Sequence, residues 1–372
     1  MTVAYYIASP HWGGGEQYVY DLARHMHSRL GYTCVFLFPA HSDETMVARF
    51  STIGTCPSFP FSHKLFRFSP LAAFCLNRLL RKYKVDILHI NSRQSYFIAA
   101  LAKRMSRDLR VVVTQHLVRK ASAGWLWQWA YRQMDVLICP SRLVARTYLA
   151  SPKVQTAFAS VQIIPNSVPI TVSSLRNDLP TNEIPTIFYH GRICREKGII
   201  PFIHVLETLK KTPFRLLVAG SVEARIQETW NHILANSPIR ERIEYVGFCN
   251  DIAPLMQQSH IGIIPSLVPE TTPLALLENM AYGLATISSN NGSQPEFMSV
   301  SEGFLCSPLT GSGKGEQEWR EALQFLLSNP EYCLQMGQNA QKRFQNELRY
   351  DQFMDKIQQI YIACISRGQH YA

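Results

Sequence analysis

Two carboxylates eight positions apart are the first residues in this sequence whose type and spacing could do chemistry. Glu270 and Glu278 lie in the stretch PETTPLALLENMAYG (269–283), with no charged residue between them. Glu278 has leucine, methionine and alanine neighbours, and a carboxylate is costly to bury without partners. At the edge of an apolar surface it can accept hydrogen bonds from two vicinal hydroxyls, such as those of a ribose, while Glu270 holds other hydroxyls. The alternative is that Glu278 pairs with a basic residue and that Glu270 is solvated.

The residues between the two acids predict the start of a helix. Thr272 is a favoured N-cap residue and Pro273 is favoured at the first helical position. The helix would continue through Leu274 and end near Gly283. On the 3.6-residue period, Glu278 falls on or beside the face that begins at Leu274. The free N–H groups at this helix start would favour an anion.

A charged turn forms the second motif, YHGRICREKG (189–198), which follows a strand-like run. Arg192 and Lys197 flank the turn, and a helix is expected to begin at Gly198. A guanidinium, an ammonium and a helix N-terminus together make a clamp for a diphosphate. The structural alternative is a solvated charged turn.

Three glycines follow the first strand-like run, in WGGGEQ (12–17). Glycine lets the backbone come close to a ligand. The stretch is not the dinucleotide-binding fingerprint, because Tyr18 occupies the third glycine position, so a dehydrogenase is disfavoured.

His116 lies just past the strand-like run VVVTQ, at a strand end where ligands bind. A lone histidine there is either structural or functional. There is no D-x-D pair, and no histidine or cysteine cluster has the spacing of metal ligands, so we expect no catalytic metal.

Short runs rich in valine and isoleucine alternate with helix-like stretches, which predicts buried parallel sheets with crossover helices. The pattern breaks in the Pro-, Ser- and Asn-rich segment 165–185, which we interpret as a linker, and then restarts. We therefore expect two doubly wound α/β domains, 1–168 and 169–348, facing across a cleft, and a last helix, 349–372, that either caps the second domain or crosses back to the first. The strand-like runs are 3–9, 33–38, 86–90, 110–115, 135–141, 161–166, 186–191, 214–220, 243–248, 261–266 and 285–290.

The composition is that of a globular protein of 372 residues with a net charge of +10. Residues 1–168 hold 20 Lys and Arg against 7 Asp and Glu, whereas residues 169–372 hold 17 against 20. A basic first half suits nucleic acid, an anionic membrane surface or an anionic substrate. The nine scattered cysteines fit a reducing compartment. Neither a signal peptide nor an apolar run of roughly 18 residues is apparent.

Basic residues of the first half interleave with aromatic and aliphatic ones in two stretches, 62–84 and 119–132. Such a surface can rest on an anionic membrane, or the tryptophans can pack in the core while the charges are solvated. The residues concerned are Lys64, Arg67, Arg78, Arg81, Lys82, Lys84, Trp125, Trp127 and Trp129.

Taken in order, these motifs resemble the family 4 retaining glycosyltransferases of the GT-B fold. The set is GGGE, TQH, CPS, IIPNSV, GRICREKG, LLVAGS, GF and PS…E-x7-E…AYG, and it spans nearly the whole chain. The chain departs from the family pattern at Asn166-Ser167, where Asn-Gly is usual. It departs again at Thr271-Thr272-Pro273, where Gly-Phe-Gly is frequent, and this second change touches the donor-sugar pocket.

The resemblance implies a nucleotide-sugar donor (UDP-, GDP- or ADP-linked) bound by the second domain and a glycan or lipid-linked acceptor bound by the first. Arg192 and Lys197 would bind the diphosphate, Glu270 the donor sugar and Glu278 the ribose. The donor set also includes Thr272, Pro273 and Leu274. His116 would approach the reacting sugar, while Gly14 and Gly15 would let backbone N–H groups near the phosphate. The resemblance also implies that the last helix, 349–372, crosses back to the first domain.

The resemblance further implies metal-independent transfer in polysaccharide, lipopolysaccharide or glycolipid synthesis. The expected location is the cytoplasm, including the inner face of the cell membrane. One alternative is a GT-B sugar-nucleotide epimerase, which needs no acceptor. Another is a basic nucleic-acid-binding protein, although the sequence holds no nucleic-acid motif and we expect no nucleic acid partner. A third is an inactive relative.

Overall fold

The computed structural model divides the chain into two compact units. Unit 1 comprises residues 1–165 and 351–372, and unit 2 comprises residues 166–350. All nine cysteines are free thiols. The residues that the structure describes are 1–7, 9, 12–59, 61, 69–172, 174–179 and 184–369.

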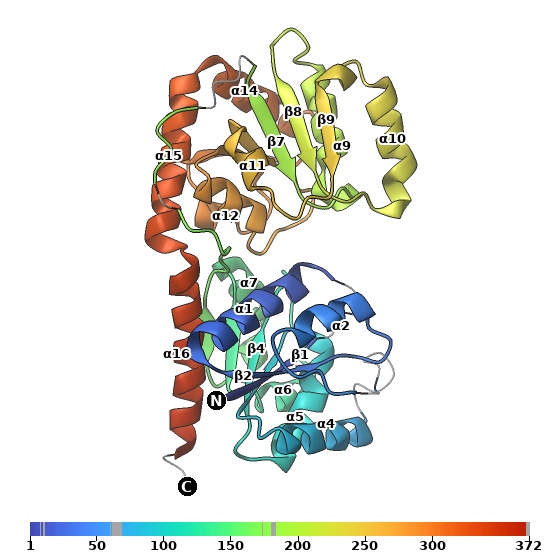
Figure 1. The fold of residues 1–372 in the computed structure, drawn as a ribbon, viewed down its shortest axis with the longest axis vertical. Helices are drawn as coiled ribbons and strands as arrows, with labels where there is room; N and C mark the ends of the chain where they lie inside the picture. The colour runs from blue at the N-terminus through green and yellow to red at the C-terminus, as the bar shows by residue number, and fades with distance from the viewer. Residues whose placement is uncertain are drawn as a thin grey trace. The chain divides into compact units, whose positions relative to one another are not determined.

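Unit 1 is built on a parallel six-stranded sheet in the order β2-β1-β3-β4-β5-β6 (Figure 1). The strands are short and mostly apolar because helices cover both faces of such a sheet. Their bounds are β1 (Thr2–Tyr6), β2 (Thr33–Leu37), β3 (Ile87–Ile90), β4 (Arg110–Thr114), β5 (Val136–Cys139) and β6 (Val161–Ile163). The helices are α1 (Gly14–Leu30), α2 (Glu44–Ser51), α4 (Pro70–Lys82), η1 (Arg93–Ser95), α5 (Tyr96–Met105), α6 (Trp125–Tyr131), α7 (Arg142–Tyr148), α8 (Pro152–Gln155) and α16 (Tyr350–Gln369).

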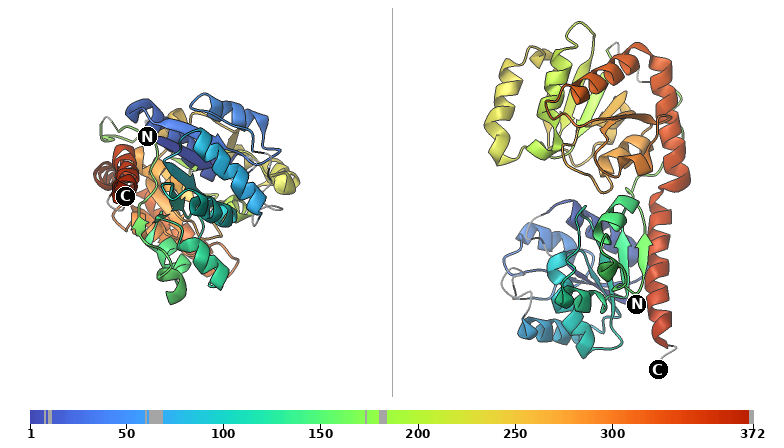
Figure 2. Two further views of the ribbon diagram at one scale, coloured as in Figure 1. Left: turned by 90° about the horizontal axis from the view of Figure 1, so that it is seen from below. Right: turned by 180° about the vertical axis from the view of Figure 1, so that it is seen from behind.

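The C-terminal helix α16 belongs to unit 1 although it follows all of unit 2 in the chain. Figures 1 and 2 show it lying along this unit. Buried Tyr361 fixes it to the sheet, because its hydroxyl lies 2.6 Å from Nδ1 of His89 on β3. The other ring nitrogen of His89 lies 2.7 Å from the hydroxyl of Thr114, so a buried polar link joins α16 to two strands.

Unit 2 is built on a second parallel sheet in the order β12-β11-β10-β7-β8-β9. Its strands are β7 (Thr186–His190), β8 (Arg215–Ala219), β9 (Ile243–Gly247), β10 (Ile261–Ile264), β11 (Ala285–Ser289) and β12 (Gly303–Cys306). Its helices are η2 (Arg195–Lys197), α9 (Ile199–Glu207), η3 (Ala224–Ile226), α10 (Gln227–Asn236), η4 (Arg240–Arg242), α11 (Ala253–Gln257), α12 (Leu274–Ala281), α13 (Gln294–Phe297), α14 (Lys314–Ser328) and α15 (Pro330–Glu347).

The two parallel sheets confirm the predicted doubly wound architecture, and every predicted strand is present. Strand β12 was not predicted, because its residues Gly303–Cys306 open with glycine and include no valine or isoleucine. In both units the chain first adds strands on one side of its first strand and then continues on the other side, so that its direction of travel across the sheet reverses. This reversal point lies between β1 and β3 in unit 1 and between β7 and β10 in unit 2. Ligands of such folds bind at the carboxyl ends of the strands at this reversal.

The segment interpreted as a linker packs on unit 2 over much of its described length. The guanidinium of Arg176 donates to the carbonyl oxygens of Gln257 and Ser259 at 2.9 and 2.8 Å. Its backbone N–H donates to Oε1 of Gln341 at 2.7 Å. These contacts explain why unit 2 begins at residue 166, before the first strand of its sheet.

Candidate functional site

The loop after β7 is pressed against the end of β10, at the reversal point of unit 2. Gly198 adopts a φ of +69°, and a Cβ built there would lie 2.0 Å from the carbonyl oxygen of Pro265. Only glycine fits this conformation and this close approach. The N–H of Leu267 also donates to the carbonyl of Glu196 at 2.8 Å. The charged turn and the loop after β10 are therefore held together.

Lys197 and Glu270 meet across these two loops. Nζ of Lys197 lies 2.5 Å from Oε1 of Glu270. The same carboxylate oxygen accepts from the hydroxyl of Ser266 at 2.6 Å. Asn291 in turn donates from Nδ2 to the Ser266 carbonyl at 2.9 Å. Among the described residues Oε2 of Glu270 has no hydrogen-bond partner, so it is available to a ligand hydroxyl.

The loop after β11 supports the Glu270 backbone. Both the N–H and the hydroxyl of Ser293 donate to the Glu270 carbonyl, at 3.0 and 3.2 Å. A Cβ on Gly292 would lie 2.4 Å from the Glu270 nitrogen. Our sequence reasoning missed Ser266, Gly292 and Ser293. The run of small residues SSNNGS (288–293), at the end of the predicted strand 285–290, was the available signal for Gly292 and Ser293.

Arg192 lies in the same turn as Lys197 and is exposed. Its carbonyl accepts from the hydroxyl of Tyr189 at 2.9 Å, which fixes the backbone while the guanidinium extends outward. Within the described part of the chain, Arg192 forms no salt bridge. Its five N–H donors therefore remain available to an anion at this edge.

Glu278 pairs with a residue that the sequence reasoning did not single out. Its Oε2 lies 3.3 Å from Nδ1 of His190, the last residue of β7. The side chains of His190 and Glu278 are 8% and 24% exposed. Burial raises the pKa of Glu278 to about 8 and lowers the pKa of His190 to about 4. At neutral pH the pair therefore holds one proton.

The start of α12 differs by one residue from the prediction. The helix begins at Leu274, and Pro273 is the N-cap residue, with an extended ψ of 109°. The Pro273 carbonyl accepts from the N–H groups of Leu276 and Leu277, at 2.9 and 3.3 Å. Thr272 precedes the cap and is buried, so it is not the N-cap that we predicted. The first-turn N–H groups beyond the proline are those of Leu274 and Ala275.

The remaining predicted residues, His116, Gly14 and Gly15, lie in unit 1. Nε2 of His116 is 3.2 Å from Oδ1 of Asn91, and its ring meets the ring of Tyr18 edge-on at 4.6 Å. Burial lowers the pKa of His116 to about 4, so its imidazole is neutral at pH 7. Gly14 and Gly15 open α1, and added Cβ atoms there would meet no atom within 4 Å. That residues of both units act on one bound molecule stays a prediction.

Three potential metal-ligating atoms come together beside the charged turn. They belong to Cys194, Glu196 and Glu223 and lie within 4.8 Å of one another. Glu196 is exposed, and Glu223 pairs with Arg225 at 3.3 Å. An acidic cluster of this kind does not by itself make a metal site.

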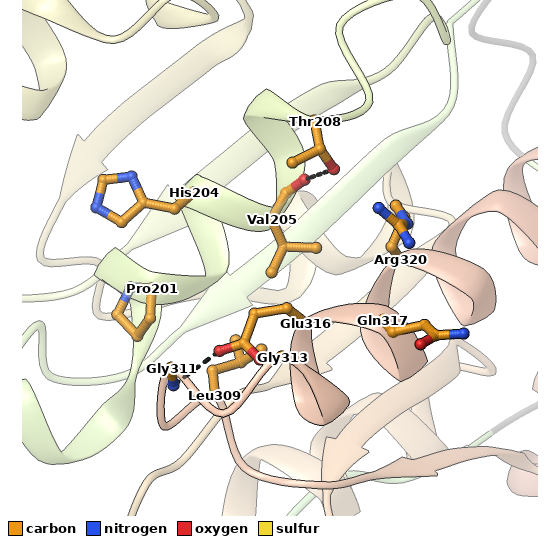
Figure 3. Close-up of a pocket in the computed structure, with 10 residues that line it drawn as sticks. All are labelled: Pro201, His204, Val205, Thr208, Leu309, Gly311, Gly313, Glu316, Gln317 and Arg320. Carbon is orange, nitrogen blue, oxygen red and sulfur yellow. Dashed lines mark hydrogen bonds between the residues drawn. The ribbon is translucent and has the colours of Figure 1, made fainter.

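A hollow of about 380 Å³ lies between α9 and the start of α14. Figure 3 shows the side chains that line it. Its lining includes His204, Arg320 and Glu316, and Glu316 accepts from the Gly311 N–H at 2.9 Å. None of the predicted site residues lines it, and we assign it no role in the chemistry described here.

An amphipathic face of unit 1 corresponds to the predicted basic surface. Helix α4 exposes Leu71 (63%) and Phe74 (57%) in its first turns. Its later turns expose Arg78, Arg81 and Lys82. Within the described residues no helix combines the length and apolar character needed to cross a bilayer.

The predicted aromatic residues of this surface have different environments. Trp125 is 79% exposed. Trp127 and Trp129 pack against the core of unit 1. Lys64 and Arg67 lie outside the described residues.

Comparison with known proteins gives matches along nearly the whole chain. Residues 12–172 match the family model described as Glycosyltransferase Family 4, and residues 174–343 match Glycosyl transferases group 1. An Escherichia coli UDP-Gal:alpha-D-GlcNAc-diphosphoundecaprenol alpha-1,3-galactosyltransferase is 22% identical, over 77% of this chain and 78% of its own. A phosphatidylinositol N-acetylglucosaminyltransferase subunit of Arabidopsis thaliana is 25% identical, over 80% of this chain and 69% of its own.

Solved structures share the fold. A glycosyltransferase from Rickettsia africae superposes with a TM-score of 0.83 at 18% identity, covering 98% of both chains. The Anabaena protein Alr3699/HepE, in complex with UDP and glucose, superposes with a TM-score of 0.75 at 17% identity, covering 98% of this chain and all of its own.

Proposed function

Because this chain belongs to the family 4 glycosyltransferases of the GT-B fold, we propose that it moves a sugar from a nucleotide-sugar donor to an acceptor hydroxyl with retention of the anomeric configuration. The proposal rests on the ion pair between Lys197 and Glu270 at the reversal point of unit 2. Arg192 lies beside them in the same loop. This combination of cations and an acid suits a sugar diphosphate.

The two cations would bind the diphosphate. An ammonium has three N–H donors, and Glu270 takes one from Lys197, so two remain for phosphate oxygens. The exposed guanidinium of Arg192 can bind a second pair of oxygens in bidentate fashion. The N–H groups at the start of α12, after Thr272 and Pro273, would add to the positive potential. The charges are thus arranged before the donor arrives.

The two acids would bind the hydroxyls at the two ends of the donor. Oε1 of Glu270 is held by Lys197 and Ser266, which leaves Oε2 to accept from a sugar hydroxyl. Glu278, on α12, would accept from the ribose hydroxyls. Glu278 is costly to keep as a carboxylate at this half-buried position, which suits a group whose partners arrive with the ligand.

The reaction would proceed on one face of the sugar. The bond between the anomeric carbon and the diphosphate oxygen breaks as the acceptor oxygen forms the new bond, and the hydroxyl proton passes to the departing diphosphate. Arg192 and Lys197 stabilise the negative charge that develops on that leaving group. His116, a neutral imidazole, would contact the sugar through a hydrogen bond, and Gly14 and Gly15 leave room for a ligand beside α1. No metal ion takes part in this scheme.

We favour UDP as the nucleotide and a lipid-linked glycan as the acceptor. The E. coli relative is named for UDP-Gal and a diphosphoundecaprenol acceptor, and the Arabidopsis relative for phosphatidylinositol. A structural neighbour was solved with UDP. A lipid-linked acceptor would bring unit 1 to a membrane, where the apolar and basic residues of α4 suit an anionic surface. In that case the protein is peripheral at the inner face of the cell membrane.

A thermal-shift screen with UDP, GDP, ADP and their sugars tests the donor, because a ligand bound only by the folded state raises the melting temperature. The proposal expects a shift with one base and its sugar conjugates. The active donor is then incubated with lipid-linked acceptors in EDTA, and the anomeric configuration of the product is read by NMR. Inversion, a requirement for a divalent ion, or acceptor-free formation of an epimerised nucleotide sugar would each contradict the proposal.

Vesicle flotation tests the membrane contact separately. The wild-type protein should float with anionic liposomes at low salt, and the double variant Leu71→Ser/Phe74→Ser should remain in solution. Equal recovery of the two proteins with the liposomes would show that α4 is not the contact surface.

A further inference from the structure

His190 is surrounded by hydrogen-bond acceptors at a largely buried position, with 8% of its side chain exposed. Nδ1 lies 3.3 Å from Oε2 of Glu278, and Nε2 lies 3.4 Å from Oδ1 of Asn279. The ring also bonds to the carbonyl of Ala275. It stacks on Phe188 with its centroid at 5.1 Å and the planes 18° apart, which fixes its orientation. A ring with acceptors at both nitrogens is suited to carry two protons.

The titratable groups around this pair come from three further places. Lys197, in the turn after β7, opposes a positive charge on His190. The pKa of Tyr282, after α12, is raised by burial and by the negative charges of Asp251, from the loop before α11, and of Glu278. In the absence of a ligand, burial and Lys197 favour the uncharged state, in which the Glu278 carboxyl O–H donates to Nδ1 of His190.

Ribose hydroxyls change this balance. Two hydroxyls that both donate bind more strongly to a carboxylate, which only accepts, than to a carboxylic acid, which keeps an O–H donor. A bound diphosphate also brings negative charge close to Lys197, which offsets the effect of that cation on His190. Both changes favour the ion pair over the uncharged pair.

We propose that His190 takes the proton of Glu278 when a nucleoside diphosphate binds, so that the carboxylate which the ribose requires forms without exchanging a proton with solvent. The O–H bond of Glu278 breaks, and an N–H bond forms at Nδ1 of His190. The imidazolium then donates to Glu278 from Nδ1 and to Asn279 from Nε2. His190 is thus a positioning residue, and the inference rests on the proposed donor site.

The consequence is a binding affinity that does not depend on the protonation of Glu278. In the wild-type protein the free and bound pairs contain the same number of protons, so donor binding stays independent of this pair between about pH 5.5 and 7.5. In His190→Val no internal acceptor remains, while the pKa of Glu278 stays raised because burial is its cause. Binding to that variant must then release a proton, and it weakens as the pH falls.

Calorimetric titration with UDP at pH 5.5, 6.5 and 7.5 measures this difference, with GDP or ADP in its place if the screen selects them. Titration of the nucleotide itself is common to both proteins and cancels in the ratio of their dissociation constants. The dissociation constant of His190→Val divided by that of the wild type should rise by about two orders of magnitude from pH 7.5 to pH 5.5. This rise follows the ionisation of one group with a pKa near 8. A ratio constant within about threefold would overturn the inference.

Two controls make the test specific. His204→Val removes another histidine of unit 2, which is exposed and pairs with Glu207. The dissociation constant of this variant divided by that of the wild type should stay near one at every pH. With the 2′,3′-dideoxy nucleotide the ratio for His190→Val should become independent of pH. An equal rise with the dideoxy nucleotide would mean that the proton acts elsewhere than on the ribose, which overturns the inference.

The wild-type protein offers a second measurement in case His190→Val does not fold. Titrations at pH 7.5 in buffers of different ionisation enthalpy count the protons released on binding. We expect close to none, and release of nearly one proton per nucleotide would overturn the inference. If neither protein binds any nucleoside diphosphate, the donor site itself is wrong, and the inference fails with it. Binding with the wrong pH response refutes only the role of His190.

Discussion

The ammonium of Lys197 lies 2.5 Å from Oε1 of Glu270, although 73 positions separate the two residues in the chain. The contact joins the loop after β7 to the loop after β10, on the two sides of the point where the chain changes its direction of travel across the sheet of unit 2. It follows that neither residue can be changed without affecting the other. Loss of the lysine leaves a half-buried carboxylate that retains only the Ser266 hydroxyl on the same oxygen.

Lys197→Ala and Arg192→Ala should each reduce turnover by roughly 10²-fold or more, the scale for losing one preorganised charge contact at a leaving group. Steady-state transfer assays with saturating donor measure this loss. Lys211→Ala, which removes an exposed lysine of the same unit, is the matched control and should retain full activity. Near-normal turnover in both site variants, with melting temperatures unchanged, would exclude the clamp.

Glu278→Gln should increase stability at alkaline pH while abolishing donor binding. The folded-state pKa of Glu278 is raised to about 8, so burial favours the protonated acid, and its contribution to stability is lost as the pH rises from about 4.5 through 8. A glutamine does not ionise, so the variant should gain about 2–4 kcal/mol over wild type at pH 8.5 and little at pH 4.5.

Urea denaturation of wild type and Glu278→Gln at these two pH values measures the gain. The same stability difference at both pH values would mean that the carboxyl group is not destabilised by burial. Tighter nucleotide binding by the variant would contradict the role in ribose recognition.

Gly198→Ala should destabilise unit 2 because the added Cβ would meet the Pro265 carbonyl at 2.0 Å in a backbone conformation with φ of +69°. We expect a loss of at least about 2 kcal/mol in the free energy of unfolding, from strain and from separation of the two loops. Gly14→Ala is the control for stability alone, since its Cβ would meet no atom within 4 Å. Equal melting temperatures for the two variants would refute the close approach.

Tyr361→Phe should loosen α16 from unit 1. The change leaves one ring nitrogen of buried His89 without its partner at 2.6 Å, at a cost of about 1–3 kcal/mol. Hydrogen exchange of the α16 amides should become faster than in Ile362→Ala, which removes a half-exposed side chain from the same helix. Unchanged exchange in Tyr361→Phe would show that this hydrogen bond does not anchor the helix.

Much of the fold could be predicted from the sequence because its signals are local. Short runs such as Arg110–Thr114 and Ile261–Ile264 read as buried strands on composition alone. Strand β12 was missed because it opens with glycine and holds no valine or isoleucine. The start of α12 was placed one residue early, because Thr272 and Pro273 match the preferences of the N-cap and the first helical position, whereas in the structure Pro273 is the N-cap.

The candidate site was harder to predict, because its contacts depend on the order of strands in the sheet. Arg192, Lys197, Glu270 and Glu278 could be named from residue type and spacing. Nothing near His190 in the sequence indicates that it lies against Glu278, since the contact requires β7 and β10 to be neighbours. Ser266 was missed because a single serine carries no pattern of its own, whereas Ser293 lies in a run of small residues that was not interpreted.

The most direct test of the central claim compares binding of a nucleoside diphosphate and of its nucleoside monophosphate to wild type and to Lys197→Ala by calorimetry. If the diphosphate is held at the edge shared by β7 and β10, the variant should lose at least about tenfold in affinity for UDP, or for GDP or ADP if the screen selects them, the scale of one charge-assisted hydrogen bond. Its affinity for the monophosphate should change far less. Equal affinities of the two proteins for the diphosphate would contradict the account.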